Sequence, residues 1–210
     1  LAYDEKPYVS GMMTSAMGTT IDLTAEGTKD WAQFNADDVD VYARKDTENT
    51  ISGLRRLVEG GVDHAVDMPL YYTATDAKDT QPTSQTCITS RGEEGKAGFE
   101  FNLPYSDKMQ HANLYVSSWN ATTRVEVLVN GSVMYTATYG GSDGWDVRKI
   151  SLDYKLMDPS DELLVRQILV TSNTGGSGGS GGLPAVTLAE TAAEIPRPSH
   201  GYVVGTTENA

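Results

Sequence analysis

The chain is poor in the residues that build covalent frameworks and reactive centres. Its 210 residues include one cysteine, Cys87, and three histidines, His64, His111 and His200. A single cysteine excludes an intramolecular disulfide framework and a Cys-rich zinc site. Because the histidines are dispersed along the sequence, a Cys/His nucleophile is also disfavoured.

Basic residues and long apolar runs are scarce as well. There are 16 basic residues against 29 acidic ones, a net charge of −13, which argues against binding to a nucleic-acid backbone. The acidity is compatible with cations or neutral sugars as ligands, or with a role in solubility alone. No stretch approaches the roughly 20 apolar residues of a membrane helix, so we expect no membrane insertion. A hydrophobic share of 39% excludes disorder throughout. Because the sequence opens at Leu1 without a methionine, we expect a secreted origin.

Residues 175–182 consist of glycine and serine alone. Natural linkers are seldom this pure, so we interpret this segment as an engineered Gly/Ser linker. Such a chain behaves as a random coil with an end-to-end distance of roughly 15 Å. It divides the sequence into a domain at 1–174 and an appended peptide at 183–210, which is too small to hold a core of its own.

The appended peptide has features of an extended segment. Short apolar alternations occupy residues 184–190 and 201–205, with Pro196 and Pro198 between them. An extended peptide on a flexible tether is suited to adding a strand to an open sheet edge. We therefore expect residues 183–210 to fold back onto the same chain. A native extension whose inner loop was replaced by the linker, and a disordered cloning remnant, stay open as alternatives.

Residues 1–174 carry the alternation of apolar and polar side chains that is typical of strands. Asn130-Gly131 between two such runs is the strongest short hairpin signal. Helical turns are expected only at 30–34 and 51–58. We predict an all-β fold, a jelly-roll-like antiparallel β-sandwich with at most short helical turns. The predicted strands cover residues 19–23, 39–43, 97–103, 113–119, 124–129, 133–139, 147–152 and 163–170.

Catalytic patterns in the sequence are weak. Residues 140–144 fit the G-x-S-x-G elbow of serine hydrolases, which needs a helix after it and a later histidine. Strands flank this segment on both sides, and His200 lies beyond the linker, so we interpret it as a hairpin loop. Neighbouring acids such as Asp22 and Glu26 arise by chance among 29, which disfavours a glycosidase. We predict that the chain is not an enzyme.

Aromatic side chains can bind a sugar, because the apolar faces of sugars stack on rings while polar side chains form hydrogen bonds with the hydroxyl groups. Trp145 follows the Gly-rich loop at 140–144, a polar setting that suits a binding loop. Two tyrosines precede a polar stretch at 73–84. We predict that the ligand-binding residues are Trp145, Tyr72, Tyr71, Asp143 and Arg148.

Three acids cluster at Asp37, Asp38 and Asp40. Calcium takes carboxylate and carbonyl oxygens from loops, so these residues are candidate ligands of a structural calcium ion. A solvated acidic loop is the alternative.

Residues 20–32, TIDLTAEGTKDWA, resemble the "DLTAEGT-DWA" signature of a bacterial accessory β-sandwich module of the galactose-binding-like or carbohydrate-binding-like type. Such modules occur in secreted or surface-attached multidomain proteins. The similarity extends over about residues 18–172 through ordinary strand patterns, and it implies a noncatalytic, exported jelly roll without settling the ligand. We interpret Asp22, Glu26 and Trp31 as structural: a turn with a hydrogen-bonding acid and a core indole.

We therefore expect a noncatalytic binding or adhesion module of a bacterial cell-surface or secreted protein, with a glycan as the favoured ligand. The alternative is a structural interaction domain completed by its tethered C-terminal strand, as in surface-fibre or partner-peptide assembly.

Overall fold

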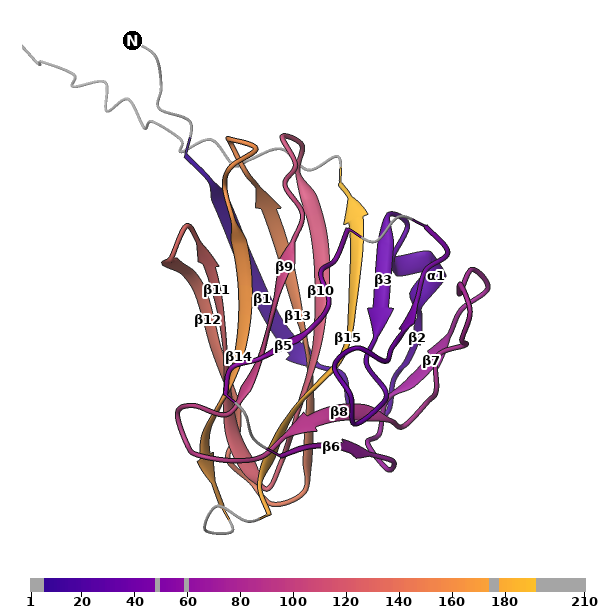
Figure 1. Ribbon diagram of the computed structural model, residues 1–210, viewed down its shortest axis with the longest axis vertical. Coiled ribbons are helices and arrows are strands. Elements are labelled where there is room, and N and C mark those ends of the chain that lie inside the picture. Colours follow the sequence, from indigo (N-terminus) through magenta and orange to yellow (C-terminus); the bar gives the residue numbers. More distant parts are fainter. Residues whose placement is uncertain (1–5, 48–49, 59–60, 174–177, 192–210) are drawn as a thin grey trace, which may run out of the picture.

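The computed structural model describes residues 6–47, 50–58, 61–173 and 178–191. Within these residues the chain forms strands and one short helical turn. Two antiparallel sheets lie face to face as a sandwich (Figure 1). The predicted all-β, jelly-roll-like sandwich is confirmed.

The larger sheet consists of β1 (Tyr8–Ser15), β3 (Asp30–Gln33), β4 (Ala43–Arg44), β6 (Val62–Ala65), β8 (Cys87–Ser90), β10 (Gln110–Trp119), β13 (Trp145–Lys155) and β15 (Ser180–Glu190). Its main path has the order β1-β13-β10-β15-β3-β4. Strand β8 joins this path by pairing with β15, and β6 pairs with β8. This sheet carries all the features on which the proposals below depend.

The smaller sheet consists of β5 (Arg55–Arg56), β9 (Gly98–Leu103), β11 (Ala121–Val129), β12 (Ser132–Gly140) and β14 (Leu163–Ser172), in the order β12-β11-β14-β9-β5. Asn130 and Gly131 connect β11 to β12 with φ angles of 49° and 80°. Two successive positive φ angles give the tight turn that matches the twist of a hairpin, so the predicted hairpin is confirmed. The strands β2 (Thr20–Asp22) and β7 (Tyr71–Thr73) form a separate parallel pair, and α1 (Leu23–Glu26) follows β2.

Three of the predicted local elements are wrong. Only the last residue of the strand expected at 39–43 lies in β4, because Asp38 folds the segment into a turn: its Oδ1 accepts a hydrogen bond from the backbone N of Asp40 at 2.9 Å. Residues 30–33 of the helical turn expected at 30–34 form β3 instead, and all four residues of β3 are buried. A short run buried on both faces lacks the alternation that separates strand from helix. The turn expected at 51–58 contains β5.

Apolar side chains form two main cores. The first lies between the sheets and includes Phe99 from the smaller sheet and Leu114 from the larger one. The second lies on the other face of the larger sheet and includes Trp31, Tyr115 and Leu70. The middle of the larger sheet is therefore buried on both faces, which explains why several of its strands lack a polar side.

The residues of the signature at 20–32 have the structural roles inferred from the sequence. The Asp22 side chain caps α1, and the buried Trp31 donates its indole N–H to Asp76 Oδ1 at 2.9 Å. Glu26 Oε2 accepts a hydrogen bond from the Tyr115 hydroxyl at 2.7 Å. The interpretation of Asp22, Glu26 and Trp31 as structural is confirmed.

The carboxyl of Asp76, which accepts the hydrogen bond from Trp31, makes the free energy of unfolding depend on pH. Burial raises its pKa, but hydrogen bonds from Lys45, Thr24 and Trp31 outweigh burial and hold the pKa below its ordinary value. Its stabilising effect is therefore complete above about pH 4, the ordinary Asp pKa, and is lost as the pH falls through the lower folded-state value. We expect Asp76→Asn to cost about 1 kcal/mol at pH 7.

Urea unfolding of wild type and Asp76→Asn between pH 7 and pH 2.5 measures this difference. The difference in the free energy of unfolding between wild type and Asp76→Asn should shrink below about pH 4, where the wild-type carboxyl takes up a proton. The exposed Asp37→Asn serves as the matched control. A gap for Asp76→Asn that stays constant over the whole range contradicts the prediction.

Strand β15 lies inside the larger sheet rather than at an edge. It pairs with β10 along one side and with β3 and β8 along the other, and Figure 1 shows it in yellow between β10 and β3. Its first three residues, 180–182, belong to the Gly/Ser segment. The division of the chain at that segment stays a prediction, and the tail from residue 192 onward lies outside the described residues.

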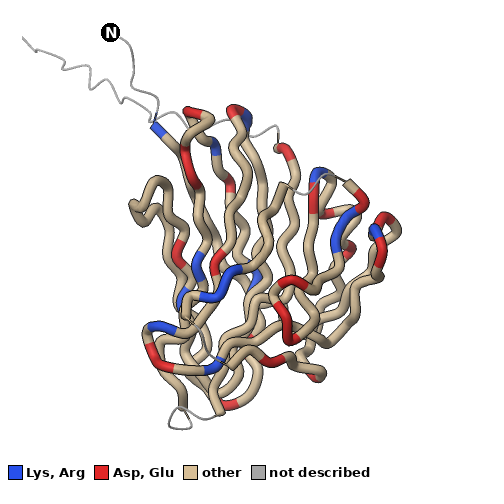
Figure 2. Tube along the Cα trace, in the orientation of Figure 1, with Lys and Arg blue, Asp and Glu red and all other residues tan. Residues whose placement is uncertain are grey.

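Charge is spread over the molecule. Figure 2 shows acidic positions on both sheets, with basic positions scattered among them. No helix in the described part of the chain is long and apolar enough to cross a membrane.

Candidate ligand-binding site

A cavity of about 340 Å³ lies at one end of the larger sheet, where β10 ends and β13 and β15 begin. Its other wall comes from β6, β8 and the residues that follow them. A volume of this order falls within the range of small-ligand pockets, about 300–1,000 Å³. We call it the indole pocket, and its lining residues are His64, Ala65, Val66, Asp67, Thr89, Arg91, Trp119, Trp145 and Ser180.

Two tryptophans form the apolar wall of the indole pocket. Trp119 and Trp145 lie directly opposite each other on β10 and β13, with ring centroids 5.0 Å apart and planes tilted by 50°. Both are half-buried, and the indole N–H of Trp145 is buried without a hydrogen-bond partner among the described residues. Ser180 of β15 lies opposite Trp119 on its other side. The strand pairing therefore fixes both rings at the rim of the sheet.

Polar groups face these rings from the other wall. His64 on β6 and Asp67 just after it are exposed. Arg91 follows β8, and its guanidinium lies 2.5 Å from Asp63 Oδ2 in an ion pair. The pocket thus combines an aromatic wall with an imidazole, a carboxylate and a guanidinium, which can donate to and accept from hydroxyl groups.

A second hollow of about 450 Å³ has a different character. It is lined by the cationic side chains Arg56, Lys96 and Arg166 together with Glu100, and Arg166 is paired with Glu100 at 3.3 Å. No aromatic ring is among its lining residues in the described part of the chain. The indole pocket is therefore the better site of the two for stacking a neutral sugar on an aromatic ring.

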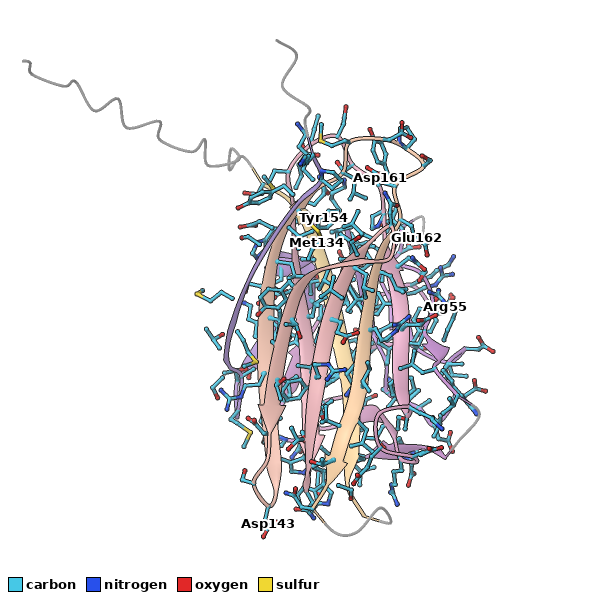
Figure 3. The ribbon with its side chains drawn as sticks, turned by 90° about the vertical axis from the view of Figure 1, so that its left-hand side faces the viewer. Arg55, Met134, Asp143, Tyr154, Asp161 and Glu162 are labelled. Carbon is cyan, nitrogen blue, oxygen red and sulfur yellow. The ribbon has the colours of Figure 1, made fainter. Side chains whose placement is uncertain are left out.

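Of the ligand-binding residues predicted from the sequence, only Trp145 lines the indole pocket. Arg148 lies three residues further along β13, on the opposite face of the strand, where its Nε pairs with Asp146 Oδ1 at 2.6 Å. Asp143 is exposed at the tip of the turn between β12 and β13, where Figure 3 labels it at the end of the sandwich. Of these three residues, only Trp145 is among the lining residues of the indole pocket.

The two tyrosines of the prediction lie on β7, outside the indole pocket. Tyr71 is 37% exposed, whereas Tyr72 is only 6% exposed and belongs to the second core. Burial raises the pKa of the Tyr72 hydroxyl well above its ordinary value. A surface ligand cannot stack on a ring covered in this way, so the placement of Tyr72 argues against its predicted role.

The predicted calcium ligands Asp37, Asp38 and Asp40 lie in the exposed turn before β4. One oxygen of Asp38 is used by the backbone N of Asp40. Within the described residues, no group of three or more His, Cys, Asp or Glu side chains is placed to hold a metal ion. The calcium site stays a prediction.

Cys87 and the G-x-S-x-G segment at 140–144, which were considered as reactive groups in the sequence, are parts of the β-sandwich framework. Cys87 is buried on β8, and burial raises the pKa of its thiol to about 12, so it remains protonated at neutral pH. Residues 140–144 form the turn from β12 to β13, as the interpretation of a hairpin loop requires. A strand follows this turn, where a hydrolase elbow has a helix.

Most of the indole pocket could not be found from the sequence. Trp119 at the end of one predicted strand, and Trp145 just before another, gave the one available signal. His64, Asp67 and Arg91 join the pocket only because β6 and β8 attach to the larger sheet beside β15.

Comparisons with known proteins found likenesses of structure alone. No family model and no curated protein sequence matches the chain. A structure of TmCBM61 in complex with beta-1,4-galactotriose is 9% identical, covers 70% of this chain and 99% of its own, and has a TM-score of 0.41. A Paenibacillus sp. cycloisomaltooligosaccharide glucanotransferase complexed with cycloisomaltoheptaose is 10% identical over 68% of this chain and 19% of its own, with a TM-score of 0.32. The Stig cyclase Fisc from Fischerella sp. TAU, in complex with an indole compound, is 16% identical over 76% and 85%, with a TM-score of 0.38. A carbohydrate-binding module is thus among the similar structures.

Proposed function

We propose that the chain is a noncatalytic binding module of a bacterial surface or secreted protein, and that it binds a glycan in the indole pocket. The observation that carries this proposal is the pair of half-buried rings, Trp119 and Trp145, which face exposed polar side chains across a cavity of about 340 Å³. A sugar ring presents apolar C–H faces and a polar rim, and this lining matches both.

The polar side chains of the indole pocket suit hydroxyl groups rather than a chemical reaction. Asp67 can accept hydrogen bonds, Arg91 can donate them, and His64 can do either. The partnerless indole N–H of Trp145 is a further donor that the protein leaves unused. Since the Cys87 thiol is buried and protonated, it offers no nucleophile to a bound sugar.

Trp145→Ala tests the proposal. A glycan array identifies ligands of the wild-type chain, and calorimetry then compares wild type with the variant. Loss of a central aromatic anchor should weaken binding by about 2 kcal/mol, roughly thirtyfold. Tyr71→Ala, also an aromatic truncation but outside the pocket, should bind as wild type does. No signal on the array, or equal binding by wild type and Trp145→Ala, refutes a glycan site in the indole pocket.

A second candidate function is a structural interaction domain that a strand completes. The observation in its favour is the place of β15 between β10 and β3, with Val186 and Leu188 fully buried in the main core. Without this strand, the facing edges of β10 and β3 would present rows of unpaired backbone groups, which are a template for pairing with another chain.

A further inference from the structure

Both ends of β15 lie near places where the chain could continue. At its start, Gly179 N donates to Ser172 Oγ at 3.1 Å, so β15 begins beside the end of β14. At its end, Glu190 lies opposite Gln110 of β10, which lies opposite Tyr154 of β13, which in turn lies opposite Val9 of β1. Three strand spacings make this separation about 14 Å. The same strand could therefore follow β14 or precede β1.

The composition of the two connections distinguishes these possibilities. The connection from β14 is the segment 175–182, which holds only glycine and serine. On the other side stand residues 191–210 and 1–7, 27 residues of mixed composition that include three prolines. A segment of glycine and serine alone is typical of a linker that is engineered to join two chain ends. This difference in composition favours the beginning of the chain, rather than the end of β14, as the natural neighbour of β15.

The length of the natural connection then points to a second molecule. A gap of about 14 Å needs few residues, and loops longer than about 12–15 residues are uncommon inside a compact domain. A connection that runs through residues 191–210 and 1–7 holds at least 27 residues, which can span about 90 Å when extended and so reach another molecule. We propose that residues 183–190 are a strand that one copy of this chain donates to a second copy, with residues 183–210 preceding residue 1 in the natural order. This inference deepens the second candidate function and is independent of glycan binding.

The groove that receives the strand lies between β10 and β3, and both β10 and β3 pair with that strand. On one side, β10 pairs with residues 185–190 of the strand from Gln110 to Tyr115. On the other side the signature segment supplies β3, and Lys29 N just before it donates to Leu188 O at 3.0 Å. Glu26 Oε2 accepts a hydrogen bond from Thr187 Oγ1 at 3.4 Å. The segment 20–32, the most distinctive part of the sequence, thus forms one wall of a strand-accepting groove.

Side chains of β15 also fix its position along the groove. Leu183, Val186 and Leu188 enter the main core, whereas Ala185 enters the second core. A shift of the strand by one residue would exchange these faces and bring Thr187 into the main core. The groove therefore selects the sequence 183–190 and not merely an extended peptide.

A permuted chain tests the proposal. Residues 183–210 are placed directly before residue 1, and the chain ends at residue 173, so the Gly/Ser segment is absent. Light scattering after size-exclusion chromatography measures its mass over a range of concentrations. We expect the permuted chain to reach at least twice the single-chain mass, rising with concentration, whereas the 210-residue chain stays at 22.6 kDa. A permuted chain that remains a single molecule, with the thermal midpoint of the 210-residue chain, overturns the proposal.

A peptide separates strand exchange from aggregation. An excess of the synthetic peptide of residues 183–190 should occupy the grooves and reduce the assemblies to one chain with one peptide. The same peptide with Leu188→Asp should leave the mass unchanged, because its carboxylate would enter the main core. Assemblies that the wild-type peptide does not dissociate are aggregates, and they overturn the proposal. Binding of the 210-residue chain to glycans tests the indole pocket separately, so the failure of one proposal leaves the other standing.

Discussion

Deletion of residues 183–210 should lower the thermal midpoint of the chain by at least about 10 °C or abolish cooperative unfolding. The deletion removes three large apolar side chains from the main core, those of Leu183, Val186 and Leu188. Burial of each contributes about 1.5–3 kcal/mol, and each kcal/mol corresponds to about 2–4 °C in a domain of this size. The deletion also opens the backbone edges of β10 and β3. Differential scanning calorimetry of the shortened and full chains measures the effect.

A point substitution checks the same prediction without shortening the chain. Leu188→Ala should cost about 2–5 kcal/mol, because Leu188 is fully buried and its truncation leaves a cavity. Glu190→Gln is the matched control, since Glu190 lies at the exposed end of the same strand and its ion pair with Lys108 is long, at 3.6 Å. If the deletion and Leu188→Ala both leave the melting curve unchanged, β15 does not stabilise the sandwich.

The second large effect is expected for Asp30→Ala. Asp30 is 1% exposed, and its Oδ2 accepts hydrogen bonds from the backbone N atoms of Thr50 and Ile51 at 2.8 and 2.9 Å. Its Oδ1 accepts from the backbone N of Trp31 at 2.9 Å. Removal of the carboxylate leaves these N–H groups without their acceptor, at a cost of about 3–5 kcal/mol. The midpoint of unfolding should fall by roughly 6–20 °C.

Chemical unfolding in urea measures the change, with Asp143→Ala as the control because Asp143 is exposed in a turn. Asp30→Asn keeps one carbonyl oxygen as an acceptor and should fall between wild type and Asp30→Ala. A loss below about 1 kcal/mol for Asp30→Ala would show that the segment at Thr50 and Ile51 does not depend on this carboxylate.

The sequence was sufficient to predict elements whose structure is determined locally. Residues 97–103 alternate strictly, and Asn130-Gly131 adopts the two positive φ angles of its turn, so β9 and the β11–β12 hairpin follow from neighbouring residues. The segments at β3 and β8 are buried on both faces, so their sequences show no alternation. Their structure depends on neighbours that are distant in the chain.

The candidate site illustrates the same limit. Trp145 was predicted because the Gly-rich turn beside it indicates exposure. Arg148, close in sequence, lies on the other face because side chains alternate along a strand. The rest of the indole pocket comes from four strands, β6, β8, β10 and β15, and the residues that follow β6 and β8, so no local pattern connects His64 with Trp119.

Among the described strands, β8 reaches the larger sheet only through β15: Gly182 lies opposite Thr89, and Gly181 lies opposite Ser90. Strand β6, which carries His64, is attached through β8. In the 210-residue chain, the wall of the indole pocket that faces the tryptophans is therefore attached to the larger sheet through two glycines of the Gly/Ser segment, which lie outside residues 183–190. By thermodynamic linkage, a ligand bound against this wall would stabilise the pairing of Gly181 and Gly182 with β8 by the same factor by which that pairing strengthens ligand binding.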